Sequence, residues 1–267
     1  MQNTISNGKV MMARKSLFQR IQIAISNYFH LVFIRWANIR NEWYFHFLMT
    51  PLIPIGLIVF LKFAGAVRTP AEALYVTAGN TIMSLIIGPM QSMSNDLALN
   101  KERRDFDFLA LLPISRLQLI LAYTTVSTIF TIPGMLITLF IGKLWFGFPM
   151  EFNIFVPVIM LLSALSMVGL GVMIGVNSKS IHHANIVNAI ITALVTFMSP
   201  VLVQENHLPE FLRYLSKLFP TTYSAKAFRL ALNGDIGGDM YFNLLILLGF
   251  TVAFLFIAVK KIDWRSN

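Results

Sequence analysis

The chain has 267 residues, of which 56% are hydrophobic and 12% are charged, and its formal net charge is +9. Soluble domains carry about 25% charged residues, so this composition indicates a polytopic membrane protein without a second, hydrophilic domain. The absence of cysteine excludes disulfides, thiolate metal sites and cysteine nucleophiles. The positive charge fits the basic cytoplasmic loops of membrane proteins. No hydrophilic basic domain is present to bind nucleic acid, so we expect no nucleic-acid partner.

Residues 1–44 are predicted to form a cytoplasmic N-terminal segment, because their polar start lacks the apolar core of a signal peptide. Within this segment, Leu17–Asn41 carries apolar residues at spacings of three and four, which is typical of an amphipathic helix. Its basic flanks and Trp36 favour a position in the cytoplasmic membrane interface. The alternative is an early start of the first span, which Arg35 and Arg40 would make costly.

Six segments are long and apolar enough to cross a membrane, given that a spanning helix needs about 20 residues. The larger share of the 21 Lys and Arg residues falls on one side when both termini are placed in the cytoplasm, as the positive-inside rule predicts. The sequence therefore predicts an all-α, polytopic membrane protein with one transmembrane domain over residues 1–267. The predicted spans are 45–61, 74–93, 118–141, 152–176, 184–203 and 241–259.

The segment Asn95–Arg116 is the one internal stretch in which charged residues cluster. A polar segment between long apolar ones is predicted to leave the membrane, and the charge count places it in the cytoplasm. Its later half, Asp107–Leu112, turns apolar and stops at Pro113. This pattern predicts a short amphipathic helix at the membrane surface, which could act as a rigid lever.

The fourth predicted span, residues 152–176, carries serines and glycines at spacings of three and four. Small residues in this pattern allow helices to approach closely. We expect them to pack within this chain; the alternative is a helix that lines a translocation route or a dimer seam.

Residues 204–240 are predicted to lie on the outer side of the membrane. Apolar residues recur there at helical spacing and are interrupted at Pro209, Pro220 and Gly234. Two short amphipathic helices broken at Pro220 fit this pattern. They are too short and too charged to span, so we expect them to dip into the outer leaflet or to cap the bundle.

No catalytic motif is present: the sequence lacks the metalloprotease, nucleophile-elbow and phosphate-loop patterns. The pair His182–His183 has no nearby carboxylate, so we interpret it as a solvated turn rather than a metal site. No charged residue falls near the middle of a predicted span, where ion-coupled carriers keep their coupling site. We expect no catalytic residue, metal or cofactor on this chain, which is then either passive or powered by a partner.

Several of these features together resemble the membrane subunit of a type-2 ABC exporter. They are the basic interfacial helix, the six spans, a charged loop that ends in Leu-Pro113-Ile-Ser115-Arg116, and an outer motif that includes Phe219-Pro220-Thr-Thr-Tyr223. The family commonly has Leu-Pro-x-Ser/Thr-Arg in the loop. One departure is the mixed charge of Lys101–Asp105 where a single acidic residue is more usual, so the residue that carries coupling stays open.

The resemblance implies that two such subunits pair, as a homodimer or with a paralogue, and that two ATPase subunits bind below them and hold ATP and magnesium. It also implies a bacterial inner (plasma) membrane location, contact with membrane lipid, and export of an apolar or amphipathic substrate such as a drug, lipid or peptide. The candidates for coupling to the ATPase are Lys101, Glu102, Arg103, Arg104, Asp105, Asp107, Pro113 and Arg116. The candidates for the outer re-entrant motif are Pro209, Pro220, Tyr223 and Arg229.

Two other classes of function are compatible with a polytopic chain. A stand-alone or substrate-binding module, such as a channel or a vitamin-capture subunit, would have no ATPase partner. An intramembrane enzyme would need Asp or His residues clustered at a membrane face, and the sequence shows no such cluster.

Overall fold

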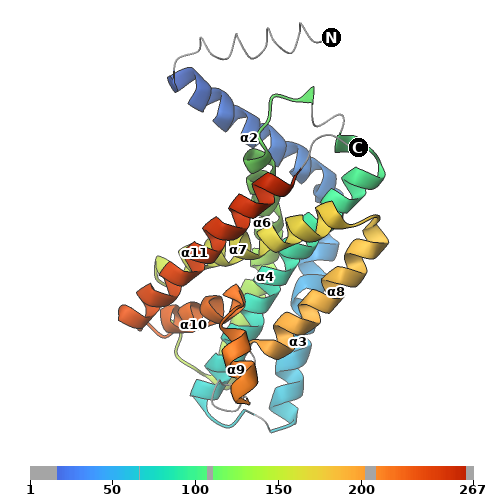
Figure 1. Cartoon of the computed structure of the whole chain (residues 1–267). Coiled ribbons are helices and arrows are strands. Elements are labelled where there is room, and N and C mark those ends of the chain that lie inside the picture. The colour runs from blue at the N-terminus through green and yellow to red at the C-terminus, as the bar shows by residue number, and fades with distance from the viewer. Residues whose placement is uncertain (1–16, 66, 107–110, 202–208, 263–267) are drawn as a thin grey trace, which may run out of the picture.

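The computed structural model describes residues 17–65, 67–106, 111–201 and 209–262, in which the regular elements are helices without strands (Figure 1). This confirms the predicted all-α class. The elements are α2 (Leu17–Ile39), η1 (Arg40–Glu42), α3 (Trp43–Phe63), α4 (Pro70–Glu102), α6 (Arg116–Phe146), α7 (Phe155–Asn177), α8 (Ile181–Met198), α9 (Glu210–Ser216), α10 (Pro220–Leu232) and α11 (Gly238–Lys261).

Helix α4 is the centre of the bundle, because it packs against α3, α6, α7, α8 and α10. Its side chains contribute to both hydrophobic cores, one around Ile82 and Ile86 and the other around Met93 and Leu97. At 1.5 Å per residue this helix is about 50 Å long, which exceeds the hydrocarbon thickness of about 30 Å. It therefore has length to spare beyond the membrane core.

Five helices are long and apolar enough to cross a membrane, namely α4, α6, α7, α8 and α11. They correspond to the last five predicted spans and confirm a polytopic membrane protein. The first predicted span lies in α3, of which the described apolar part, Thr50–Phe63, is shorter. The first predicted span, residues 45–61, and with it the total of six, therefore stays a prediction. Helix α2 confirms the predicted N-terminal helix, and its position at the membrane surface also stays a prediction.

Several helix boundaries differ from the predicted spans; α6, for example, ends at Phe146 rather than at residue 141. Helix α4 does not stop at residue 93 but continues to Glu102. Helix α8 was expected to reach residue 203 but ends at Met198. The reason for the difference in α8 is local: Ser199 precedes Pro200 and adopts an extended conformation, as the residue before a proline usually does.

The glycines of α7 lie where neighbouring helices come closest. A β-carbon on Gly169 would meet Phe254 of α11, and one on Gly171 or Gly175 would meet the backbone of α4 at Met90 or Ser94. The predicted packing of this small-residue helix within the chain is therefore confirmed.

Two short helices, α9 and α10, follow α8 as predicted, and they are separated at Pro220. The break is anchored to the end of α8, since the Ser199 hydroxyl lies 3.0 Å from those of both Thr221 and Thr222. Helix α10 then packs against α4, α7 and α11. Whether the two helices enter the outer leaflet stays a prediction.

The bundle has two distinct ends. Helix α2, the end of α4 and the end of α11 lie at one end, whereas α9 and the start of α4 lie at the other (Figure 1). The charged segment that follows α4 is therefore at the same end as the two described ends of the chain.

The close contact between α7 and α4 gives a first prediction. A β-carbon on Gly171 would lie 3.1 Å from the carbonyl carbon of Met90 and closer still to its oxygen, so Gly171→Ala must push the helices apart. We expect a loss of about 1–3 kcal/mol in stability, seen as a lower thermal unfolding midpoint of the purified full-length protein. Gly249 of α11 has open space around it, so Gly249→Ala is the control and should unfold at or slightly above the wild-type temperature. Equal midpoints for the two variants would contradict this packing.

Candidate functional site

The charged segment Asn95–Arg116 is helical in its first part. Helix α4 runs through Glu102, and Arg103 caps it by donating its backbone N–H to the carbonyl of Leu99. Arg104 follows with a φ of 61°, the left-handed conformation that commonly ends a helix. The expectation of a loop from Asn95 onward is therefore corrected: the chain departs from the helix only at Arg103.

Two of the predicted coupling residues bind the turn between α7 and α8. The Lys101 ammonium donates to the carbonyl of Val176 at 2.9 Å, near the end of α7. The Glu102 carboxylate accepts from the backbone N–H of Ile181 at 3.1 Å, at the start of α8. A cation at a helix C-terminus and an anion at a helix N-terminus both interact favourably with the helix dipoles. These side chains therefore fix the end of α4 to the turn that joins α7 and α8.

The next three residues point away from the bundle. Arg103, Arg104 and Asp105 are exposed, and the structure records no ion pair between them and another described residue. Asp107 and most of the predicted helix at 107–112 lie outside the described residues, so that helix stays a prediction. Leu111 exposes 83% of its surface, which adds an apolar contact point beside the exposed charges.

The end of the segment is fastened to α2. The Asn27 side-chain amide donates to the carbonyl of Pro113 at 2.7 Å, and the Gln118 amide donates to the carbonyl of Ala24 at 2.9 Å. Gln118 also completes a capping box with Ser115, which starts α6. The local sequence around Pro113 predicts the end of a helix but does not indicate its contact with Asn27.

A buried ion pair joins α2 to α4. Arg35 of α2 binds the carboxylate of Asp96, and the side chains of both residues are 15% exposed. The same guanidinium donates to Ser92 at 3.1 Å and lies 4.9 Å from the centre of the Tyr123 ring of α6. Ser127 of α6 completes the network by donating to Ser92 at 3.0 Å.

Sequence reasoning missed this pair because it assigned Arg35 to an interfacial helix and Asp96 to a cytoplasmic loop. A signal was nevertheless present. Asp96 follows an apolar span directly, and a charge beside hydrocarbon needs a partner of opposite sign. The sequence does not say which cation takes that role.

Arg116, at the start of α6, connects the segment to the last helix. Its guanidinium donates to the carbonyl of Val259 at 3.1 Å, close to the end of α11. Lys101, Glu102, Pro113 and Arg116 thus all bind other parts of the chain, whereas Arg103, Arg104 and Asp105 remain exposed.

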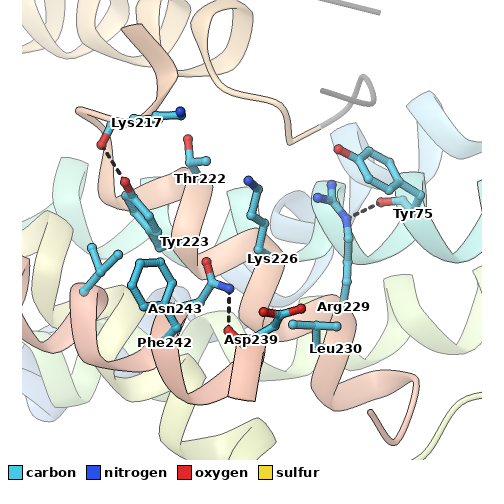
Figure 2. A pocket seen from close by; sticks show the side chains of 11 residues that line it. Tyr75, Lys217, Thr222, Tyr223, Lys226, Arg229, Leu230, Asp239, Phe242 and Asn243 are labelled. Atoms are coloured by element: carbon cyan, nitrogen blue, oxygen red, sulfur yellow. Dashed lines mark hydrogen bonds between the residues drawn. The ribbon is translucent and has the colours of Figure 1, made fainter. Parts of the chain in front are cut away.

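A second polar centre lies at the opposite end of α4, around Arg229 of α10. Its guanidinium donates to the carbonyls of Tyr75, Pro200 and Val201, and it stacks 3.4 Å from the centre of the Tyr75 ring (Figure 2). Gly79 makes room for this approach, because a β-carbon there would meet both Arg229 and the carbonyl of Val201. Arg229 therefore holds α10 against α4 and the end of α8.

The other predicted residues of the outer motif have local roles. Pro209 precedes α9 as its N-cap residue and Pro220 opens α10, a position that suits a residue without an N–H group. The Tyr223 hydroxyl donates to the carbonyl of Lys217 at 3.0 Å and so closes the turn between the two helices (Figure 2).

In the part of the chain that the structure describes, no three His, Asp or Glu residues come together to hold a metal ion. His182 and His183 lie in the first turn of α8, and His183 is exposed. Hydrogen bonds join the charged segment to α2, α7, α8 and α11.

A family model described as ABC-2 type transporter matches residues 27–233. The match begins within α2 and ends just after α10, so it includes both polar centres and the whole charged segment and leaves α11 outside. No curated protein matches the chain.

The ion pair between α2 and α4 gives a second prediction. Removing one partner of a buried pair leaves an uncompensated charge and costs about 3–5 kcal/mol. We therefore expect Arg35→Met to lower the thermal unfolding midpoint of the full-length protein strongly. The double variant Arg35→Met with Asp96→Leu should regain much of the loss, since no charge is then left without its partner.

The matched control is Arg103→Met, which removes an arginine that is exposed and outside the pair. It should unfold close to the wild-type temperature. A double variant no more stable than Arg35→Met alone would contradict the pair as the origin of the effect.

Proposed function

The chain belongs to the ABC-2 type transporter family, and on that premise we propose that it works as one half of an ATP-driven exporter. As a family member it is a transmembrane permease component of an ABC transporter, and its family implies partnership with an ABC ATPase subunit. We propose that two such ATPase subunits bind the complex and that ATP and magnesium are held by them rather than by this chain.

The proposed binding surface for the ATPase consists of exposed charged residues, namely Arg103, Arg104 and Asp105. Glu102 and Pro113 on either side bind other helices, so among the described residues of the segment these three side chains and Leu111 are exposed and available to meet another protein. Mixed charge beside an apolar side chain suits a specific protein interface better than a lipid surface. We name this group, residues 103–105 with Leu111, the docking patch.

Movement at the docking patch would pass into the bundle through polar contacts. Glu102 and Lys101 lead to α8 and α7, and Pro113 leads to α2 through Asn27. Because these are hydrogen bonds at the ends of rigid helices, a displacement of the patch shifts whole helices rather than single side chains.

We place both termini and the docking patch in the cytoplasm of a bacterial cell, with the chain in the inner membrane. The described ends of the chain and the charged segment lie at the same end of the bundle (Figure 1), and the positive-inside rule favours that end as cytoplasmic. The opposite end, with α9 and α10, then faces outward.

A second copy of the chain supplies the other half of the exporter in this proposal. The most apolar part of α8 is only 17% buried, compared with 72% for α4. Its exposed face is a single stripe at helical spacing, formed by Ile186, Ile190, Leu194 and Phe197. Because so little of α8 is buried within its own chain, this helix is suited to pack against α8 of a second copy at a dimer interface, which we call the seam. Such a seam, without charged side chains, would pass an apolar or amphipathic substrate outward.

The docking patch gives a third prediction. The double variant Arg103→Glu with Arg104→Glu reverses both exposed cations and should abolish the electrostatic match to the ATPase. We expect at least ten-fold less ATPase subunit to co-purify with the tagged chain, and a corresponding loss of ATP-dependent transport. The unfolding temperature should stay near that of the wild type, because neither side chain binds the bundle.

A matched reversal at the opposite end, Arg68→Glu with Lys143→Glu, is the control, since both side chains are exposed there. It should co-purify with the ATPase normally. Normal co-purification of the docking-patch variant would reject this dock.

The exposed stripe of α8 gives a fourth prediction, which the absence of native cysteine makes simple to test. We expect Ile190→Cys to form a disulfide-linked homodimer when membranes are treated with an oxidant. Val252→Cys, on the exposed face of α11, is the control and should stay monomeric. Cross-linking at Val252 but not at Ile190 would place the contact between copies elsewhere and contradict the proposed seam.

A further inference from the structure

A cavity of about 720 Å³ lies between α9, α10 and α11 and is separate from the docking patch and from the exposed stripe of α8. This volume is within the range of about 300–1,000 Å³ that is usual for small-molecule sites. Figure 2 shows Lys226 and Arg229 extending from the same side of α10, with the Lys217 ammonium on that side as well. The backbone carbonyl of Lys217 is fixed by the Tyr223 hydroxyl at 3.0 Å.

Basic side chains outnumber carboxylates among the described residues that line this cavity. Lys217, Lys226 and Arg229 line it, and among the described residues that line it Asp239 is the only carboxylate. The recorded hydrogen bonds of Arg229 go to three backbone carbonyls, one from each guanidinium nitrogen, and a carbonyl does not neutralise the charge; the guanidinium has five N–H groups in all. A positive charge held beside hydrocarbon attracts an anion more strongly than the same charge in water.

The side of the cavity that α11 contributes is mixed: Asp239 and Asn243 lie on it together with two apolar side chains. The apolar ones are Phe242 and Ile246, and the exposed face of α11 continues the apolar surface through Leu245, Val252 and Phe256. Only 22% of the most apolar part of α11 is buried within the chain. The cavity is therefore polar and cationic on the α9–α10 side and leads along α11 to a surface that suits acyl chains.

We propose that this cavity binds a phosphate-bearing anionic lipid. The phosphate lies between Lys217, Lys226 and Arg229, since ammonium and guanidinium groups are the usual protein partners of phosphate. The acyl chains lie against Phe242 and along the exposed face of α11. Each half of the site matches one half of the ligand, which a free anion or a neutral lipid would not do. The proposal requires α11 to lie in the membrane and is independent of ATP coupling.

The test is native mass spectrometry of the full-length protein, titrated in detergent with phosphatidylglycerol or with phosphatidylcholine of the same chains. We expect phosphatidylglycerol to be retained more tightly, and the variant Lys217→Gln with Lys226→Gln to weaken its retention at least ten-fold. The control variant is Lys62→Gln with Lys143→Gln, which removes two exposed cations outside the cavity and should bind as the wild type does. Arg229 is left unchanged because it holds α10 in place.

A second variant and a second probe separate a lipid from a free anion. Phe242→Ala should weaken phosphatidylglycerol binding, because it removes an apolar side chain that lines the cavity, and leave the unfolding temperature unchanged, because the side chain is 62% exposed. Inorganic phosphate at millimolar concentration should displace the lipid weakly. Equal binding of phosphatidylglycerol by the wild type and the Lys217–Lys226 variant would overturn the site. Full displacement by inorganic phosphate, with no effect of Phe242→Ala, would overturn the assignment to a lipid.

Discussion

A charged side chain beside hydrocarbon needs polar or charged partners, and near each end of α4 an arginine from a neighbouring helix contacts that helix. Arg35 of α2 binds Asp96 near one end, and Arg229 of α10 stacks on Tyr75 near the other. The stretch from Tyr75 to Asp96 rises by about 32 Å in an ideal helix, close to the hydrocarbon thickness of about 30 Å. The two contacts therefore bracket the part of the central helix that fits within the membrane core, and they determine where α2 and α10 attach to it.

The arginines near the two ends of α4 have different partners. At the Asp96 end the arginine has a carboxylate partner, so the pair is close to neutral and the contact is one of structure. At the Tyr75 end the arginine is surrounded by carbonyls, and two lysines share its cavity. Among the described residues that line this cavity, three are basic and one, Asp239, is a carboxylate, which is why we propose an anionic ligand for it. The Arg35–Asp96 contact has a carboxylate to balance its arginine, whereas the recorded hydrogen bonds of Arg229 go to carbonyls. This difference is why we interpret the first as a structural contact and propose the second as part of a binding site.

Local patterns in the sequence predicted most of the helices, because hydropathy and spacing act over a few residues. They also predicted the packing role of the glycines in α7 and the break at Pro220. They failed where partners are distant along the chain, as with Arg35 and Asp96 or Arg229 and Tyr75. Distant partners also explain why the span in α4 was predicted to end at residue 93. The polar residues that follow indicated an exit from the membrane, whereas Asp96 and Glu102 have partners in α2 and α8. Nor does a run of charges reveal that Lys101 and Glu102, although exposed, bind the backbone of Val176 and Ile181.

The contact between the charged segment and α8 gives the proposed coupling a short physical route. Glu102 binds the first residue of α8, and the buried Asn188 of the same helix donates to Ser94 and Asn95 of α4 at 3.1 Å. Helix α8 is thus bonded to α4 at two levels along one face and has its apolar stripe exposed for the second copy. In the proposed mechanism, a motion that the ATPase imposes on the residues next to Glu102 would reach the proposed seam through one helix. Because rigid helices transmit such displacements with little loss, no longer chain of contacts is needed between the docking patch and the seam.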